Sequence, residues 1–188
     1  MRPAAASNAA GSSAPTPAIA AAPTELLDRP LEFLFAEHLR HRALCARLRR
    51  IAEAGDVARA EADAIRRFLT DDLDLHDRDE AENLRPALIR RMLVEDHLEP
   101  VLGRLAAEHA GLAPMRTRIA DMLAPGAPAA AVALEPEDAS LIERFAVTMH
   151  RALAIENGIV LVLARKRLTS LDLDRMSEAM KARRKEAA

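Results

Sequence analysis

The chain has little of what several protein classes require. Its 188 residues include no tryptophan, no tyrosine, four phenylalanines and one cysteine, Cys45. A single cysteine excludes an internal disulfide and is typical of a reducing compartment. The formal net charge of −2 gives no reason to expect nucleic acid as a partner. No uninterrupted apolar run approaches the roughly 18 residues of a membrane span. We therefore expect a soluble cytoplasmic protein that binds neither nucleic acid nor membrane.

The composition that is present favours helices. Half of the residues are hydrophobic, and Ala, Leu, Arg and Glu dominate, all of which are good helix formers. Residues 1–23 are rich in Ala, Pro and Ser and are expected to form a disordered tail. We expect one all-α domain over residues 24–184, followed by a basic tail end at 185–188.

Apolar residues recur at helical spacing in four long segments. The first begins at Pro30, which suits a first turn, and ends before Gly55, a plausible C-cap. Asp56 is expected to cap the second helix and Pro86 to break or kink it, with a short helical piece at about residues 87–93 after it. We predict an up-down-up-down antiparallel four-helix bundle with a short C-terminal helix that starts and is capped near Ser170. The predicted long helices cover about residues 30–54, 56–85, 98–123 and 137–168, with a loop at 124–136.

Five polar side chains interrupt these apolar stripes. His76 and Glu80 stand four residues apart, so one helix face carries both, one turn apart. Neighbouring helices of an up-down bundle run in opposite directions. A residue early in one helix therefore lies at the same level as a residue late in the next. By this rule one level would hold the side chains of His38, His76, Glu80, His109 and Glu156.

Three imidazoles and two carboxylates make a mixed nitrogen and oxygen site. Such a set suits iron, manganese or zinc better than calcium or copper(I). Unpaired burial would cost about 1–3 kcal/mol for each group, and metal coordination would offset that cost. A buried network of hydrogen-bonded His and Glu is the alternative interpretation.

Four segments resemble the hemerythrin-like, HHE cation-binding domain. They read AEHLRHRALCARL, HDRDEAENLRP, AAEHAGL and AIENGIVLVLARKRL, and the resemblance covers about residues 28–184. It implies a four-helix bundle with a non-haem di-iron centre, in a family whose members bind oxygen, sense oxygen, iron or redox state, or handle nitric oxide and peroxides. By motif the terminal ligands are the three histidines, and Glu80 and Glu156 are the expected bridges.

The chain departs from the family pattern in its fourth helix. The histidine expected four residues before Glu156 is replaced by Ala152. His150 stands six residues before Glu156 and would point about 120° away from it. We expect His150 to be a boundary or surface residue. One metal would then have an open position, or the second metal would bind weakly and leave a mononuclear iron site; Zn and Mn are also possible metals.

Other polar residues near these stripes have other expected roles. His41 is expected to support a ligand or lie at the surface, with direct ligation as the alternative, and Asp72 to hydrogen-bond a ligand histidine. His97 is expected to be structural, and Cys45 a small buried hydrophobic residue.

We expect a non-haem iron protein that binds or senses oxygen, nitric oxide or redox and iron state, with an unknown protein partner. No residue pattern indicates a general base, a nucleophile or a substrate pocket. Two alternatives remain open: a di-iron enzyme with peroxidase-like or oxidase-like activity, and a metal-free helical scaffold.

Overall fold

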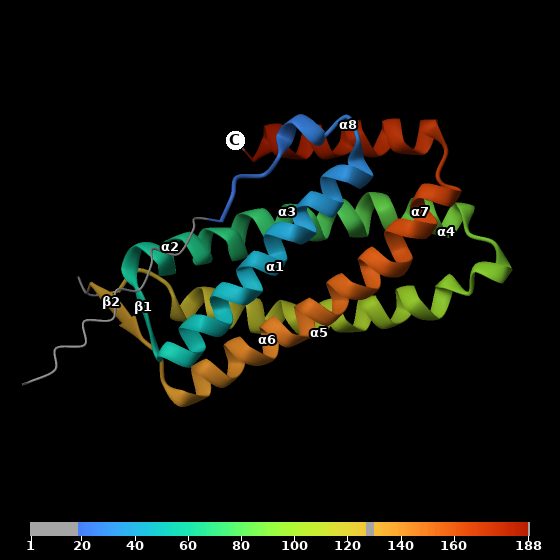
Figure 1. Cartoon of the computed structure of the whole chain (residues 1–188). Helices are drawn as coiled ribbons and strands as arrows, with labels where there is room; N and C mark the ends of the chain where they lie inside the picture. Colours follow the sequence, from blue (N-terminus) through green and yellow to red (C-terminus); the bar gives the residue numbers. More distant parts are fainter. Residues whose placement is uncertain (1–18, 127–129, 188) are drawn as a thin grey trace, which may run out of the picture.

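The computed structural model describes residues 19–126 and 130–187. Most of the predicted tail, residues 1–18, lies outside the described residues. The described chain is all-α apart from one short ribbon, and its long helices pack antiparallel (Figure 1). The helices are α1 (Pro30–Ala54), α2 (Arg59–Arg67), α3 (Leu73–Arg78), α4 (Arg85–Arg91), α5 (Leu98–Met122), α6 (Pro136–Ile155), α7 (Leu161–Arg167) and α8 (Ser170–Glu186).

Three π-helical turns join some of these helices into longer stretches. They are η2 (Phe68–Asp72), η3 (Asp79–Leu84) and η5 (Glu156–Val160), and two 3-10 turns, η1 (Thr24–Leu26) and η4 (Val94–Asp96), precede α1 and α5. The second stretch therefore runs from α2 to α4, and the last long one from α6 to α7. A π turn holds one more residue per hydrogen-bonded ring than an α-turn, and such turns are frequent at functional sites.

The ends of α1 follow the sequence prediction. Pro30 occupies the first turn, where its missing N–H costs nothing. Gly55 has a φ of 76°, in the left-handed region that glycine adopts without steric cost, and its N–H donates to the Ile51 carbonyl. Both predicted boundaries of this helix are confirmed.

The predicted N-cap at Asp56 is wrong, because Asp56 lies in a strand. β1 (Asp56–Ala58) pairs antiparallel with β2 (Ala131–Ala133), and α2 begins only at Arg59. Val57 is buried in the core, so the ribbon covers one end of the packed helices. Three-residue strands in an Ala-rich loop carry no periodic signal, which is why the sequence did not indicate them.

Of the two outcomes predicted for Pro86, a break or a kink, the break is wrong, and the short helical piece expected after it corresponds to most of α4. Helical structure continues through it, and Pro86 stands in the first turn of α4, directly after the π turn η3. A proline cannot donate the backbone hydrogen bond of a regular helix. The wider turn just before it accommodates the missing donor, and the stretch extends to Arg91.

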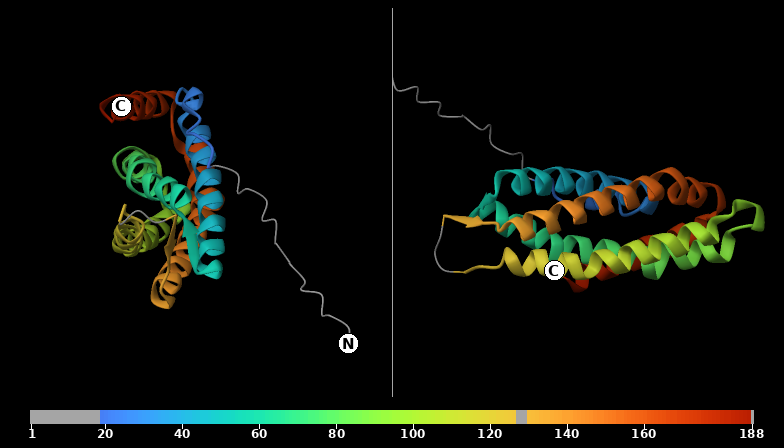
Figure 2. Two further views of the ribbon diagram at one scale, coloured as in Figure 1. Left: turned by 90° about the vertical axis from the view of Figure 1, so that its left-hand side faces the viewer. Right: turned by 90° about the horizontal axis from the view of Figure 1, so that it is seen from below.

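The last helix, α8, is longer than expected and is capped one residue earlier. The hydroxyl of Thr169, not Ser170, accepts a hydrogen bond from the Asp172 N–H. α8 lies on the outside of the other helices, against α1 and η3 (Figure 2). Asp79, which is fully buried in η3, accepts hydrogen bonds from Arg183 and Arg184 of α8. Two buried ion pairs thus attach this helix beside the candidate site.

The apolar core consists of two clusters. One cluster includes Leu44, Leu73, Leu112 and Met149, and the other includes Leu34, Leu84, Leu105 and Val160. On each of the four long stretches, the predicted polar site residues lie between a member of the first cluster and a member of the second. The site is therefore a polar layer that divides the core. Cys45 packs in the first cluster, as predicted, and burial raises the pKa of its thiol to about 12.

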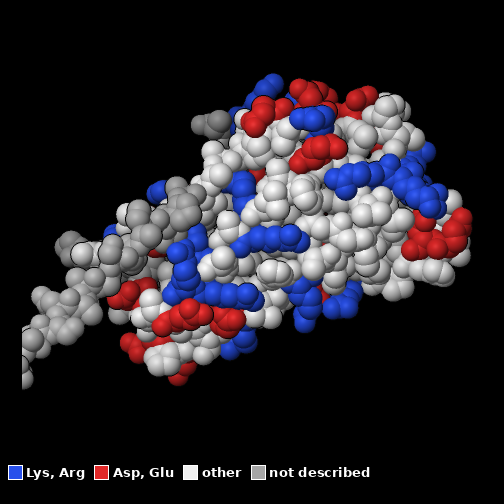
Figure 3. Space-filling model, in the orientation of Figure 1, with Lys and Arg blue, Asp and Glu red and all other residues white. Residues whose placement is uncertain are grey.

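The stretch Pro136–Arg167 is long and apolar enough, by length and composition, to cross a membrane. Its most apolar 18-residue window has a mean hydropathy of 1.4 and is 39% buried. Core helices of soluble proteins have the same composition, and this stretch packs along α1 and α5 and contains the buried carboxylate of Glu156. The outer face in Figure 3 carries Lys and Arg interspersed with Asp and Glu, with uncharged surface between them.

Candidate metal centre

The structure brings the five predicted residues together. His38 comes from α1, His76 from the last turn of α3, Glu80 from η3, His109 from α5 and Glu156 from the start of η5. Nε2 of His38 lies 3.5 Å from Oε1 of Glu80 and 3.6 Å from Oε2 of Glu156. Nε2 of His76 lies 3.7 Å from Oε1 of Glu80, and Nε2 of His109 lies 2.9 Å from Oε1 of Glu156. The predicted convergence of four helices at one level is present.

Several polar atoms of this cluster are buried and have no hydrogen-bond partner. They include His38 Nε2, His76 Nδ1, Glu80 Oε1 and Glu156 Oε1. The close approach of His109 to Glu156 therefore lacks the angles of a hydrogen bond, although the two groups form an ion pair. Leaving such atoms unpaired costs about 1–3 kcal/mol each. The alternative interpretation was a buried network of hydrogen-bonded His and Glu. That network is incomplete, because these atoms have no partner in it.

The spacing of these atoms suits a cation. Two ligand atoms that lie about 2.1 Å from one ion and at right angles to each other are about 3 Å apart. The separations of 2.9–3.7 Å between imidazole nitrogens and carboxylate oxygens are near this value. Three groups of possible ligands have their ligand atoms within 4.8 Å of one another. Two of these groups, His38–His76–Glu80 and Glu80–His109–Glu156, share Glu80, and the third is Glu37–His41–His76.

Both glutamates belong to π turns. Glu80 is the second residue of η3, and Glu156 is the first residue of η5. An extra residue in the turn changes the direction in which the following side chains point relative to a regular helix. In η5 this places Asn157 next to the site, where its Oδ1 lies 2.8 Å from Nδ1 of His38. A carbonyl on Nδ1 places the ring proton there and leaves Nε2 free for a metal.

Charge states within the cluster also suit coordination. Burial lowers the pKa of His76 well below its ordinary value, so its ring is the neutral form that binds metals. For His38, burial lowers the pKa, but contacts with Glu80 and Glu156 outweigh burial and raise it. The same balance, with Glu156 as the main partner, raises the pKa of His109 to about 9. In the absence of metal, the imidazole of His109 holds a proton at neutral pH, which a bound cation would displace.

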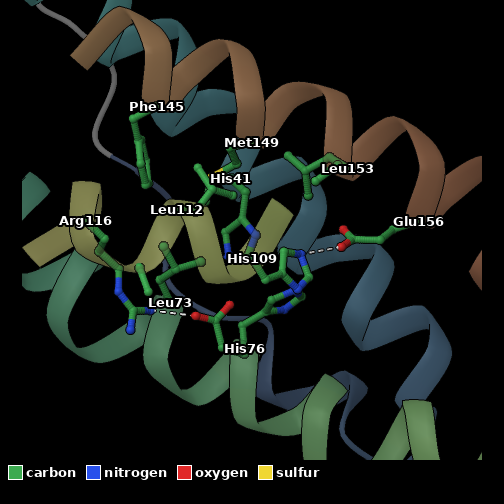
Figure 4. A pocket seen from close by; sticks show the side chains of 13 residues that line it. His41, Leu73, His76, His109, Leu112, Arg116, Phe145, Met149, Leu153 and Glu156 are labelled. Atoms are coloured by element: carbon green, nitrogen blue, oxygen red, sulfur yellow. Dashed lines mark hydrogen bonds and ion pairs between the residues drawn. The ribbon is translucent and has the colours of Figure 1, made fainter. Parts of the chain in front are cut away.

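A cavity of about 30 Å³ adjoins the cluster, with room for one water molecule or one small diatomic molecule. Its polar wall includes His76, His109 and Glu156, and its apolar wall includes Leu73, Phe145 and Met149 (Figure 4). An ion pair between Asp77 and Arg116 also borders it, with 2.6 Å between Oδ2 and Nη1. The candidate site therefore borders a small, partly open cavity.

The other predicted residues have mixed outcomes. His150 is exposed, as expected, and His97 stands just before α5 with a φ of 47°. Asp72 was expected to support a ligand histidine, but it accepts a hydrogen bond from Arg40. His41 was expected to be a supporting or surface residue; it is 1% exposed, so the surface position is wrong.

Sequence reasoning missed Asn157 as the partner of His38. An asparagine directly after Glu156 gave no signal, because the π turn that directs it inward is not visible in the apolar pattern. A scan against protein-family models gives no match for this chain, and a search of the curated proteins gives none either.

Proposed function

We propose that the protein is a hemerythrin-like four-helix bundle, with the long stretches running up-down-up-down, that binds two iron ions. His38, His76 and Glu80 would hold one ion, and Glu80, His109 and Glu156 the other. The observation that carries the proposal is the pair of buried triads that share a carboxylate whose Oε1 has no hydrogen-bond partner. Mixed imidazole and carboxylate ligands with open positions suit non-haem iron. Mononuclear iron, zinc or manganese would use the same atoms.

The protein's role would be to bind or sense oxygen, nitric oxide or peroxide, or to report redox or iron state. Iron would supply the redox chemistry and the open coordination position that such ligands need. The protein residues would hold the metals, keep bulk water out through the two apolar clusters, and offer the adjoining cavity to a small molecule. Asn157 would orient His38, and His109 would hold a proton that the bound metal displaces.

One observation favours an enzymatic variant of this role. Ala152 lines the cavity at the place where the family resemblance implies a histidine, so one of the proposed metals would have fewer ligands and more space beside it. A peroxidase-like or oxidase-like di-iron activity could use that space. Iron-loaded protein that consumes no peroxide and no oxygen in the presence of a reductant would contradict this second candidate.

The test of the main proposal is a metal count with matched variants. Protein loaded anaerobically with Fe(II) and gel-filtered should retain about two irons per chain. His76→Ala should retain less, because it removes a ligand of the His38–His76–Glu80 triad, and even the loss of a supporting group costs 10–100-fold in affinity. His150→Ala, an exposed histidine on α6, is the control and should match the parent. A parent protein that retains no iron, zinc or manganese would contradict the proposal and favour a metal-free scaffold.

A further inference from the structure

His41 is a buried imidazole with no assigned role in the proposed centre. It lies on α1, three residues after His38, and only 1% of its surface is exposed. Its Nε2 is buried and has no hydrogen-bond partner. A polar atom in that position is costly unless something completes it.

The ring of His41 lies against the candidate centre. Its centroid is 4.4 Å from that of His76, with the two planes nearly perpendicular, and 6.2 Å from that of His38. The ring of Phe68 lies 5.5 Å from that of His41, centroid to centroid, in an edge-to-face arrangement. Figure 4 shows His41, His76 and His109 converging on one cavity.

The same cavity is lined by Ala152, the residue that stands where the family resemblance implies a histidine. Ala152 is one turn before Glu156, as His76 is one turn before Glu80, and its side chain ends at Cβ. Ala152 is 2% exposed, so this position is buried inside the packed helices. His41 and Ala152 both line the cavity, together with His109 and Glu156. An unpaired imidazole therefore borders the space that an α6 imidazole would occupy.

A separate metal position built on Glu37, His41 and His76 is geometrically possible, since ligand atoms of these three residues lie within 4.8 Å of one another. The carboxylate of Glu37, however, accepts two hydrogen bonds from Nη1 of Arg40, at 2.8 and 3.1 Å. A guanidinium there already neutralises Glu37 and would repel a second cation. A metal position on the cavity side of His41 is therefore favoured over one beside Glu37.

We propose that His41 supplies from α1 the imidazole that α6 lacks at Ala152, and so completes the ligand set of the metal centre. This inference rests on the proposed two-metal function. The ligand set would then have four imidazoles and two carboxylates, and each of the four long helical stretches would contribute at least one of them.

The test moves the imidazole from one helix to the other. His41→Gln keeps most of the side-chain volume and should lower the iron retained from about two to about one per chain, or weaken one site at least 10-fold. His41→Ala combined with Ala152→His removes one imidazole and fills the space from α6, and should restore the second iron. Co(II) substitution gives an independent readout, since its visible absorption changes with the number of imidazole ligands.

The controls separate this inference from the proposed function. His150→Ala should leave iron and cobalt binding unchanged, and circular dichroism should show that every variant is helical. A parent that binds two irons while His41→Gln also binds two with equal affinity would contradict the role of His41 only. A double variant that folds but does not regain the metal lost in His41→Gln would place His41 at another position and overturn the proposal. If the double variant does not fold, the His41→Gln count alone decides.

Discussion

The stretch with His76 and Glu80 and the stretch with Glu156 have the same backbone design but different chemistry. Each glutamate lies in a π turn, and each stretch ends eleven residues after its glutamate, at Arg91 and at Arg167. Both then pass into an extended residue that leads to the next helix. One turn before the glutamate, the first stretch has a histidine and the second has Ala152.

Each stretch ends in an arginine that forms an ion pair with an aspartate located just after the other stretch. Arg91 of the first stretch donates to Asp172, which lies after the second stretch. Arg167 of the second stretch donates twice to Asp96, which lies after the first. Each aspartate also accepts from the backbone N–H three residues before it, in Leu93 and in Thr169. The two halves of the chain therefore mirror each other in their connections as well as their helices.

The two halves differ just before each glutamate. Asp79 precedes Glu80 and binds two arginines of α8, whereas half-buried Ile155 precedes Glu156 and packs against the apolar core. The carboxylates differ as well. Burial would raise the pKa of Glu80, but His38 outweighs it and the pKa is lowered, whereas burial and the nearby Glu80 raise the pKa of Glu156. A repeated scaffold thus carries two unequal ligand sets.

The largest expected effect tests which glutamate is shared. Glu80 belongs to both triads of the proposed centre, and Glu156 belongs to one. Glu80→Gln should therefore abolish retention of nearly all iron, whereas Glu156→Gln should leave about one iron per chain. Iron analysis after gel filtration measures both. Equal losses in the two variants would mean that the glutamates are equivalent and that the comparison fails.

Next in size is the effect of the residue before each glutamate. Asp79→Ala leaves Arg183 and Arg184 without their buried partner and should lower the free energy of unfolding by about 3 kcal/mol. Ile155→Ala removes half-buried apolar surface and should cost about 1 kcal/mol. Chemical denaturation of the metal-free proteins compares them. An Asp79 variant no less stable than the Ile155 variant would show that α8 depends little on these pairs.

The smallest expected effect concerns acid stability. Hydrogen bonds from Thr169 and the Arg91 guanidinium hold the pKa of Asp172 at about 2, below its ordinary value of 3.8. A depressed pKa contributes stability above pH 4, and this contribution is lost as the pH falls towards 2. Asp172→Asn should be less stable than the parent at pH 7 and should lose less on acidification from pH 4 to 2.

Asp174→Asn is the matched control, because Asp174 is exposed on the same helix. It should follow the parent at every pH. Thermal unfolding between pH 2 and 7 measures all three proteins, and a parent whose acid sensitivity equals that of Asp172→Asn would contradict the role of this carboxylate.

Most of the helical framework could be predicted from the sequence. The bounds of α1 and the extents of α5 and of α6 with α7 follow from apolar periodicity, Pro30 and Gly55, because these are local signals. The β1–β2 ribbon could not be predicted, since its pairing joins residues more than 70 positions apart through short strands. Whether Pro86 breaks the helix could not be predicted, because the outcome depends on a π turn that apolar periodicity does not record.

The sequence by itself determined that His38, His76, Glu80, His109 and Glu156 interrupt apolar stripes, since burial of a helix face requires only the 3.6-residue period. Tertiary packing decided which atoms meet. It placed the Asn157 amide on His38, turned His41 inward beside the gap at Ala152, and set Asp79 between two arginines of α8. These outcomes depend on helix rotation, π turns and contacts between distant segments, and none of those is encoded in the spacing of residues along one helix.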